Sequence, residues 1–182
     1  MQYLCGANLL ELVQGDICVQ RVDAIVNAAN ESLSAGGGVC GAIHRAAGAE
    51  LARACDKIGG CPTGEARITP GFLLRAKHVI HAVGPRWHSR TEDAVMLELA
   101  YRNALELASA HGVETIAFPA ISTGIFGYPL DEAASIAVRT VSRFLEQQSQ
   151  ITLVRFVFVN EEAFAAFRYA ARRQLVSASV AS

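Results

Sequence analysis

Residues 24–48 read AIVNAANESLSAGGGVCGAIHRAAG, and this stretch decides the fold. It begins with a short apolar run, Ala24 to Ala28, which predicts a strand covered on both faces. A polar segment with three consecutive glycines follows, and an alanine-rich segment from Gly41 to about Lys57 predicts a helix. A strand, a glycine loop and a helix in this order are typical of an α/β protein with a buried sheet.

The rest of the chain repeats this alternation of strands and helices. Four more strand-like runs lie at 9–14, 77–83, 115–118 and 153–159. Helices are predicted between them from their start and stop signals: a capping box of Ser89 and Glu92 with a stop at Gly112, a first turn at Pro129, and a cap at Asn160. The sequence therefore predicts an α/β layered sandwich.

Composition places the chain among globular proteins of one domain. It has 182 residues, of which 52% are hydrophobic and 18% are charged, so an intrinsically disordered chain is excluded. We expect one domain over residues 1–175 and a short flexible tail over 176–182. The net charge is -1, which argues against a general nucleic-acid binder or an anionic-membrane binder but permits a local anion pocket.

The five cysteines, at positions 5, 18, 40, 55 and 61, indicate the cellular compartment. Their number is odd and no pair has CxxC spacing, so neither a disulfide framework nor a zinc ribbon is expected. Reduced thiols fit a reducing compartment. The first residues lack a signal-peptide pattern, and no apolar run approaches the roughly 20 residues that span a bilayer. We expect a cytoplasmic protein without membrane attachment; the sequence leaves its oligomeric state open.

The segment from Asn27 to Asn30 and the glycines Gly36 to Gly38 form a candidate anion site. Glycines let the backbone approach a ligand closely, and the N-terminus of the following helix directs unpaired N–H groups toward it. The alternative interpretation is a flexible turn. The spacing matches neither GxGxxG nor the P-loop pattern, which argues against a standard dinucleotide-binding fold and a P-loop nucleotidase.

A second loop, PAISTGIFGYP at 119–129, also follows a strand and opens a helix. Ser122 and Thr123 supply hydroxyls, Gly124 permits close approach, and Phe126 offers either a stacking surface or ordinary packing. Two such loops at the carboxyl ends of one sheet could clamp a diphosphate. The carboxylate in Gly15-Asp16-Ile17 could accept a hydrogen bond from an exocyclic amine, although Gly-Asp is also a common turn.

Several motifs together resemble the macrodomain family, and most closely its MacroD-type branch, which includes bacterial O-acetyl-ADP-ribose deacetylases. They are GDI at 15–17, VDAIVNAAN at 22–30, GGGVCGAIHRAAG at 36–48, CPTGEARIT at 61–69, HVIHAVGP at 78–85 and FPAISTGIFGYP at 118–129. The resemblance runs from about Leu12 to Leu175. It implies a three-layer α/β/α sandwich around a mixed sheet, with ADP-ribose across the strand ends. No motif offers a ligand set for a metal or a redox cofactor, so neither is expected.

The resemblance also assigns ligand contacts along the chain. Asp16 would bond the adenine amine beside the Ile17 backbone, Asn30 would contact the distal ribose, and Phe158 would border the adenine. The two loops and the first helix would hold the distal ribose and the phosphates, with Phe126 against the ribose. The residues assigned there are Gly37, Gly38, Val39, Cys40, His44, Ser122, Thr123, Gly124, Ile125 and Phe126.

Cys40 departs from the pattern of the deacetylase branch, which usually reads GGGVDG and whose aspartate is assigned to the hydrolytic water. Cys40 could fill the pocket wall, tune the distal ribose site, or act as a thiolate nucleophile with His44 one helical turn away. Our leading hypothesis is an ADP-ribosyl ester hydrolase that acts on O-acetyl-ADP-ribose or ADP-ribosylated carboxylates, with Asn30 as its main catalytic residue and Cys40 as a second candidate. The alternative is a non-catalytic ADP-ribose reader.

Overall fold

A computed structural model describes residues 1–147 and 150–175 of the chain. Its seven strands form one mixed sheet in the order β1-β2-β7-β6-β3-β5-β4. The strands are β1 (Gln2–Cys5), β2 (Asn8–Gln14), β3 (Ala24–Ala28), β4 (Ala66–Pro70), β5 (His78–Ala82), β6 (Thr115–Phe118) and β7 (Leu153–Phe158). The five inner strands are parallel, whereas β1 and β4 run antiparallel at the two edges.

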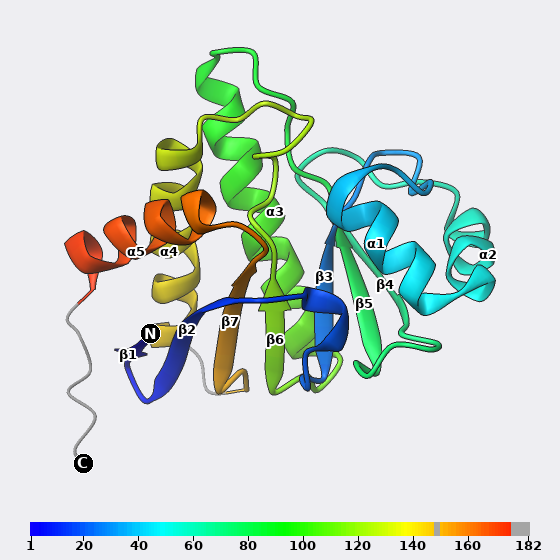
Figure 1. The fold of residues 1–182 in the computed structure, drawn as a ribbon, viewed down its shortest axis with the longest axis horizontal. Helices are drawn as coiled ribbons and strands as arrows, with labels where there is room; N and C mark the ends of the chain where they lie inside the picture. Colours follow the sequence, from blue (N-terminus) through cyan, green and yellow to red (C-terminus); the bar gives the residue numbers. More distant parts are fainter. Residues whose placement is uncertain (148–149, 176–182) are drawn as a thin grey trace.

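Helices cover both faces of this sheet (Figure 1). They are α1 (Gly38–Ala47), α2 (Ala49–Ile58), α3 (Thr91–Ala110), α4 (Leu130–Gln147) and α5 (Glu161–Gln174), together with the short 3₁₀ helix η1 (Ile17–Val19). Successive strand residues alternate between two cores: Ile25 packs with α1 and α2, whereas Val26 packs with α3, α4 and α5. The predicted three-layer α/β/α sandwich is confirmed.

The predicted helix over 41–57 is wrong in one respect, because it consists of two helices. Gly48 separates α1 from α2 with a φ of +85°, a conformation that favours glycine, and its N–H donates to the carbonyl of His44 at 3.2 Å. The first helix also begins three residues earlier than predicted, at Gly38. This earlier start brings the glycine loop directly onto the helix N-terminus.

The predicted capping box of Ser89 and Glu92 is also wrong. Ser89 has a φ of +59° and precedes the helix, which begins at Thr91. The carboxylate of Asp93 takes the capping role and accepts the backbone N–H groups of His88 at 2.7 Å and Arg90 at 3.2 Å. By contrast, the predicted cap at Asn160 is confirmed, since its side chain accepts the N–H of Ala163 at 2.9 Å.

Parallel pairing places the carboxyl ends of β2, β7, β6, β3 and β5 side by side at one edge of the sheet. The segments that follow these strands therefore meet there in the same order. They begin at Gly15, Val159, Pro119, Ala29 and Val83. The tail predicted over 176–182 lies outside the described residues.

Candidate functional site

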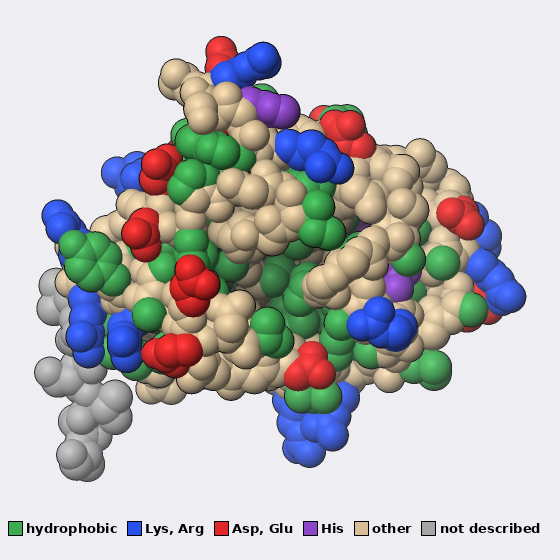
Figure 2. Space-filling view, turned by 45° about the horizontal axis from the view of Figure 1, so that its top comes forward, with side chains coloured by type: hydrophobic (Ala, Val, Ile, Leu, Met, Phe, Trp, Pro, Cys, Tyr) green, Lys and Arg blue, Asp and Glu red, His purple; other side chains and the backbone are tan. Residues whose placement is uncertain are grey.

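A cavity of about 550 Å³ lies at this edge of the sheet, a size typical of small-molecule sites. Segments that follow all five parallel strands contribute to its lining, together with the first turns of α1 and α5. Figure 2 shows the hollow, with hydrophobic side chains on its floor. Of the predicted site residues, those that line it are Asp16, Ile17, Asn30, Gly37, Gly38, Val39, Cys40, Ser122, Thr123, Gly124, Ile125, Phe126 and Phe158.

At the β2 end of the cavity, Asp16 is fixed by its neighbours. The N–H of Gly15 donates to the carbonyl of Phe158 at 2.9 Å, which ties the end of β2 to the end of β7. One carboxylate oxygen of Asp16 accepts the N–H of Cys18 at 2.8 Å and thereby caps η1. Asp16 and Phe158 both line this end of the cavity, and the ring of Phe158 is packed against Phe167.

The glycine loop brings the N-terminus of α1 to the cavity. Gly37 is the N-cap residue, and no side chain caps the helix there. The N–H groups of the first helical turn, at Gly38, Val39 and Cys40, are therefore left without the intrahelical partners that later residues have. Gly38 has a φ of +56°, a second reason for glycine in this loop. These N–H groups and the helix dipole make an anion-binding surface.

The loop after β6 forms the facing wall and is rigidly held. Ser122 has a φ of +68°, and the N–H of Tyr128 donates to its carbonyl at 2.9 Å. The hydroxyl of Thr123 donates to the carbonyl of Ala120 at 2.9 Å. The buried phenol of Tyr101 accepts the N–H of Ile121 at 3.0 Å. The loop is therefore fixed before any ligand binds.

The two loops meet across the cavity. A Cβ atom on Gly37 would lie only 3.3 Å from Cδ1 of Ile125, so a side chain at position 37 would crowd the β6 loop. The side chain of Ile125 is otherwise 78% exposed. Glycine at position 37 therefore leaves room between the two predicted anion-binding segments.

Asn30 and Cys40 share one acceptor. The amide nitrogen of Asn30 donates to the carbonyl of Ser34 at 3.0 Å, and the thiol of Cys40 lies 3.7 Å from the same oxygen. The amide oxygen of Asn30 accepts the N–H of Ser34 at 3.1 Å and the hydroxyl of Ser32 at 2.8 Å. Asn30 therefore organises the loop after β3 and retains one amide N–H for a ligand.

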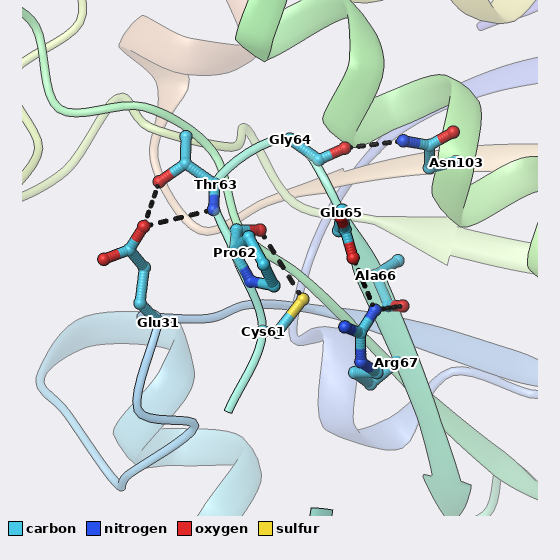
Figure 3. Close-up of polar contacts among 9 residues, drawn as sticks. All are labelled: Glu31, Cys61, Pro62, Thr63, Gly64, Glu65, Ala66, Arg67 and Asn103. Atoms are coloured by element: carbon cyan, nitrogen blue, oxygen red, sulfur yellow. Dashed lines mark hydrogen bonds and ion pairs between the residues drawn. The ribbon is translucent and has the colours of Figure 1, made fainter. Parts of the chain in front are cut away.

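The next residue, Glu31, anchors this loop to the segment that precedes β4 (Figure 3). Its carboxylate accepts the hydroxyl of Thr63 at 2.8 Å and the N–H of Thr63 at 3.2 Å, and these hydrogen bonds hold the pKa of the Glu31 carboxyl below its usual value. Asn103 of α3 donates to the carbonyl of Gly64 at 2.7 Å, which fixes the same segment from the other side. The CPTG motif thus supports the loop that holds Asn30.

Among the described residues that line the cavity, Asp16 is the one carboxylate. It follows β2, whereas Cys40 lies near the end of β3, three strands away in the sheet. The structure therefore places no carboxylate beside Cys40. Across the described ranges 1–147 and 150–175, no three His, Cys, Asp or Glu side chains are arranged to hold a metal ion.

The predicted contact of His44 with the ligand is not supported, because His44 does not line the cavity. It lies on α1 one turn beyond Cys40 and faces inward, with 9% of its surface exposed. Its Nε2 has no partner among the described residues, and burial lowers the pKa of the imidazole. An inward-facing, desolvated imidazole fits a structural role for His44.

A second buried histidine, His81, lies in the same core region. The amide nitrogen of Asn27 lies 3.1 Å from its Nδ1, and the hydroxyl of Thr69 lies 3.0 Å from its Nε2. Because an amide nitrogen can only donate, Nδ1 accepts and Nε2 carries the proton. Burial, with a contribution from His44, lowers the pKa of His81 to about 4.

Arg86 is the most informative lining residue that sequence reasoning missed. It follows β5, and its guanidinium carbon lies 4.4 Å from the ring centroid of Phe126. The predicted stacking surface of Phe126 is therefore covered on one face by a cation. The signal was available, since Gly84-Pro85-Arg86 follows a predicted strand just as Asn30 does. The other lining residues were not assigned individual ligand contacts from the sequence, although several lie in the predicted loop segments; they are Gly15, Ala28, Ala29, Gly36, Ala42, Gly84, Pro119, Ala120, Ile121, Val157, Val159, Asn160 and Ala163.

Comparison with known proteins identifies the family. The model of the Macro domain family matches residues 26–137, more than half of the chain. The chain belongs to the Macro domain family. A Macro domain-containing protein of Chlorobaculum tepidum is 54% identical over 81% of this chain and 87% of its own length. An O-acetyl-ADP-ribose deacetylase of Salmonella newport is 56% identical over 84% of this macrodomain and 88% of its own length.

Solved macrodomain structures agree with the fold. The Oceanobacillus iheyensis macrodomain with ADP has a TM-score of 0.92 and 42% identity, over 95% of each chain. The Trypanosoma brucei macrodomain in complex with ADP-ribose has a TM-score of 0.85 and 40% identity, over 89% of this chain and 68% of that chain. The family predicted from the motifs is therefore confirmed. In the described part of this macrodomain, no helix is both long enough and apolar enough to cross a bilayer.

Proposed function

We propose that this macrodomain binds ADP-ribose in the cavity and hydrolyses ADP-ribosyl esters, either O-acetyl-ADP-ribose or ADP-ribosylated carboxylate side chains. One observation supports the proposal most strongly. The chemical groups along the sheet edge follow the order of adenine, diphosphate and distal ribose in ADP-ribose. A hydrogen-bond acceptor, Asp16, follows β2; anion-binding backbone follows β6 and β3; and Asn30 with Cys40 follows β3. A relative named O-acetyl-ADP-ribose deacetylase supports the choice of reaction.

In this arrangement the adenine amine donates to Asp16, and the adenine lies near Phe158. The N-terminus of α1 and the β6 loop bind the diphosphate through backbone N–H groups, which suits its two negative charges. The free amide N–H of Asn30 bonds the distal ribose or the attacking water. His44 makes no contact with the ligand.

Hydrolysis of the acetyl ester begins with water attack on the acyl carbon. The bond from the acyl carbon to the ribose oxygen breaks, the ribose oxygen receives a proton, and the acid leaves as a carboxylate. For an ADP-ribosylated carboxylate, water can instead attack C1″ of the ribose. The products are then ADP-ribose and the free carboxylate, as they would be after attack on the acyl carbon. Because no described lining residue places a carboxylate beside Cys40, we assign the activation of water to the substrate's own phosphate, with Asn30 as the positioning group.

A second candidate function is a catalytically silent reader of ADP-ribose, and the presence of Cys40 favours it. A turnover assay distinguishes the hydrolase from the reader. Protein is mixed with O-acetyl-ADP-ribose, and free ADP-ribose is followed over time. Product formation no faster than in buffer, at high protein concentration, would leave the reader as the function.

Calorimetry with ADP-ribose, ADP, AMP and NAD tests the binding site itself. ADP-ribose should bind most tightly, because it alone occupies the adenine, diphosphate and free distal ribose positions together. At about 100 times its Kd it should stabilise the fold by about 2.7 kcal/mol, which a thermal shift assay detects. Equal affinity for AMP and ADP-ribose would contradict a site built from both loops.

We also propose a cytoplasmic location, in which the conjugates of ADP-ribose are the partners of this protein. All five cysteines have free thiols in the structure, including the buried Cys5, Cys40, Cys55 and Cys61, which fits a reducing compartment. Fractionation of cells with an antibody against the protein would test this assignment.

A further inference from the structure

Two charged side chains line the described cavity, and they lie at opposite ends. Asp16 follows β2 and Arg86 follows β5, with β7, β6 and β3 between these strands. The carboxyl ends of β2 and β5 are therefore four strand spacings apart, or about 19 Å. Arg86 starts one strand beyond Asn30, and its guanidinium reaches back over Phe126, so it lies beside the position proposed for the distal ribose.

Arg86 is held in place without neutralisation of its charge. Its guanidinium lies over Phe126, and the N–H of the next residue, Trp87, donates to the Phe126 carbonyl at 2.8 Å. None of the ion pairs found in the described ranges includes Arg86. A guanidinium stacked on a ring keeps its N–H donors available at its edge, so Arg86 is prepared to bind an anion.

The segment around Arg86 carries further basic side chains. Residues 84–91 contain Arg86, His88 and Arg90 but no carboxylate. The carboxylate of Asp93 is buried and accepts backbone N–H groups of this segment, whereas Glu92 is exposed at the start of α3. Figure 2 shows Lys or Arg and His side chains, with Asp or Glu beside them, along the rim above the hollow. Over residues 84–93 two arginines are matched by two carboxylates, and Asp93 lies beside Arg90, so Arg86 is the arginine of this segment that lines the cavity without a carboxylate partner among the ion pairs of the described residues.

We infer that Arg86 determines specificity for the group attached to the distal ribose and selects ADP-ribosyl esters of acidic peptides. The inference rests on the proposed function. The diphosphate is already bound by backbone N–H groups after β6 and β3, so Arg86 is not needed there. An acetyl group offers Arg86 no charge. An ADP-ribosylated glutamate flanked by aspartate or glutamate places carboxylates at this rim, where the planar donors of arginine match them.

Two synthetic peptides test the inference. Each carries ADP-ribose on one central glutamate through an ester; the flanking residues are Asp and Glu in one peptide and Asn and Gln in the other. The quantity measured is the ratio of kcat/KM for the acidic peptide to that for the neutral peptide. Wild-type protein should prefer the acidic peptide by about two- to fivefold, as expected for an exposed charge pair.

Arg86→Gln should bring this ratio to about one, and Arg86→Glu should invert it. The matched control is Arg75→Gln, since Arg75 is exposed and precedes β5, at the opposite edge of the sheet. That variant should keep the wild-type ratio. The preference should also fall at about 1 M salt, where charge interactions at a surface are screened within about 3 Å. An unchanged ratio in Arg86→Gln, or a ratio of one in the wild type, would overturn the inference.

A binding measurement separates this inference from the proposed function. The same peptide pair is prepared with a non-hydrolysable link to ADP-ribose, and calorimetry gives the ratio of the two affinities. A preference for the acidic peptide that Arg86→Gln abolishes supports the role of Arg86 even if the wild type cleaves neither ester. Cleavage of both esters with no difference in binding overturns the role of Arg86 and leaves the proposed function intact.

Discussion

Gly84 and Ser122 are packed so closely that a Cβ atom on Gly84 would lie 2.2 Å from the Ser122 hydroxyl oxygen. The same atom would lie 2.5 Å from Cγ2 of Ile121. Ser122 is itself in the left-handed region, and its buried hydroxyl has no partner among the described residues. The segment after β5 therefore sets the position of the β6 loop, which forms one wall of the cavity.

Gly84→Ala should destabilise the fold by about 1–3 kcal/mol, because an added methyl group in a filled space forces the Ser122 loop to shift. ADP-ribose affinity should fall in the same variant. Urea unfolding and calorimetry measure the two effects. Gly124→Ala is the matched control for stability, since a Cβ at Gly124 meets no atom within 4 Å. Equal stability of the two variants would show that the loop can move without cost.

Asp16→Asn should weaken ADP-ribose binding by about 1.5–3 kcal/mol, the range for a hydrogen bond to a charged group. Asparagine is preferred to alanine here because its amide oxygen can still accept the N–H of Cys18 and keep η1 capped. The inosine analogue of ADP-ribose has an acceptor in place of the adenine amine, so wild type should bind it poorly and Asp16→Asn should discriminate less. If Asp16→Asn binds ADP-ribose as tightly as the wild type does, the adenine does not lie against Asp16.

Cys40→Asp should raise turnover, because thiols supply neither the fixed charge nor the proton-accepting oxygen of a carboxylate at neutral pH. Cys40→Ala should change turnover little, and Asn30→Ala should lower it more than Cys40→Ala does. General-base catalysis typically contributes about 100- to 10,000-fold, so steady-state release of ADP-ribose resolves the order. The ranking fails if Cys40→Ala abolishes turnover and ADP-ribose protects the wild type from inactivation by a thiol reagent; Cys40 would then be the nucleophile.

Stability should fall as the pH decreases from about 6.5 to 4. His81 is fully buried, and its pKa is lowered from 6.5 to about 4, so the unfolded chain binds a proton in this range while the folded protein does not. Its contribution is fully present above pH 6.5 and is lost toward pH 4, at about 1.4 kcal/mol per pH unit. The buried His44, whose pKa is also lowered, acts in the same direction. Urea unfolding at several pH values measures the slope.

His81→Gln tests the source of this pH dependence. Glutamine can still hydrogen bond to Asn27 or Thr69 but does not titrate, so the slope should flatten even though the variant is less stable at pH 7.5. Proton NMR gives an independent measurement, because the His81 ring signal of the wild type should not shift between pH 7 and 5. A slope unaffected by His81→Gln would assign the pH dependence to other groups.

The inner strands and most helices could be predicted from the sequence because their side chains alternate or recur at regular spacing. The edge strands β1 and β4 were not identified. In β1 exposed and buried residues alternate over only four positions, and β4 contains Arg67 and Thr69 and ends at Pro70, so neither has a continuous apolar run. The break at Gly48 was missed because a glycine inside an alanine-rich segment does not reveal its backbone angles.

The candidate site was predictable where it is built from backbone, in the two glycine-containing loops and the start of α1. Side-chain direction was harder to predict. His44 lies on the same face of α1 as Cys40, but about one turn further from the helix N-terminus, where that face packs in the core rather than against the cavity. The place of Arg86 after a predicted strand could be read from the sequence, but its stacking on Phe126, forty residues later, could not, because only the folded sheet brings the β5 end and the β6 loop together.

Gly37 and Ile125 both line the cavity, and the absence of a side chain on Gly37 leaves room for that of Ile125. A side chain at position 37 would have to displace Ile125, so glycine there keeps the space between the two loops free. Ile125 is largely exposed, and such side chains change rotamer within about picoseconds to nanoseconds. The width of the gap between the two loops can therefore change through one side chain, without movement of either backbone.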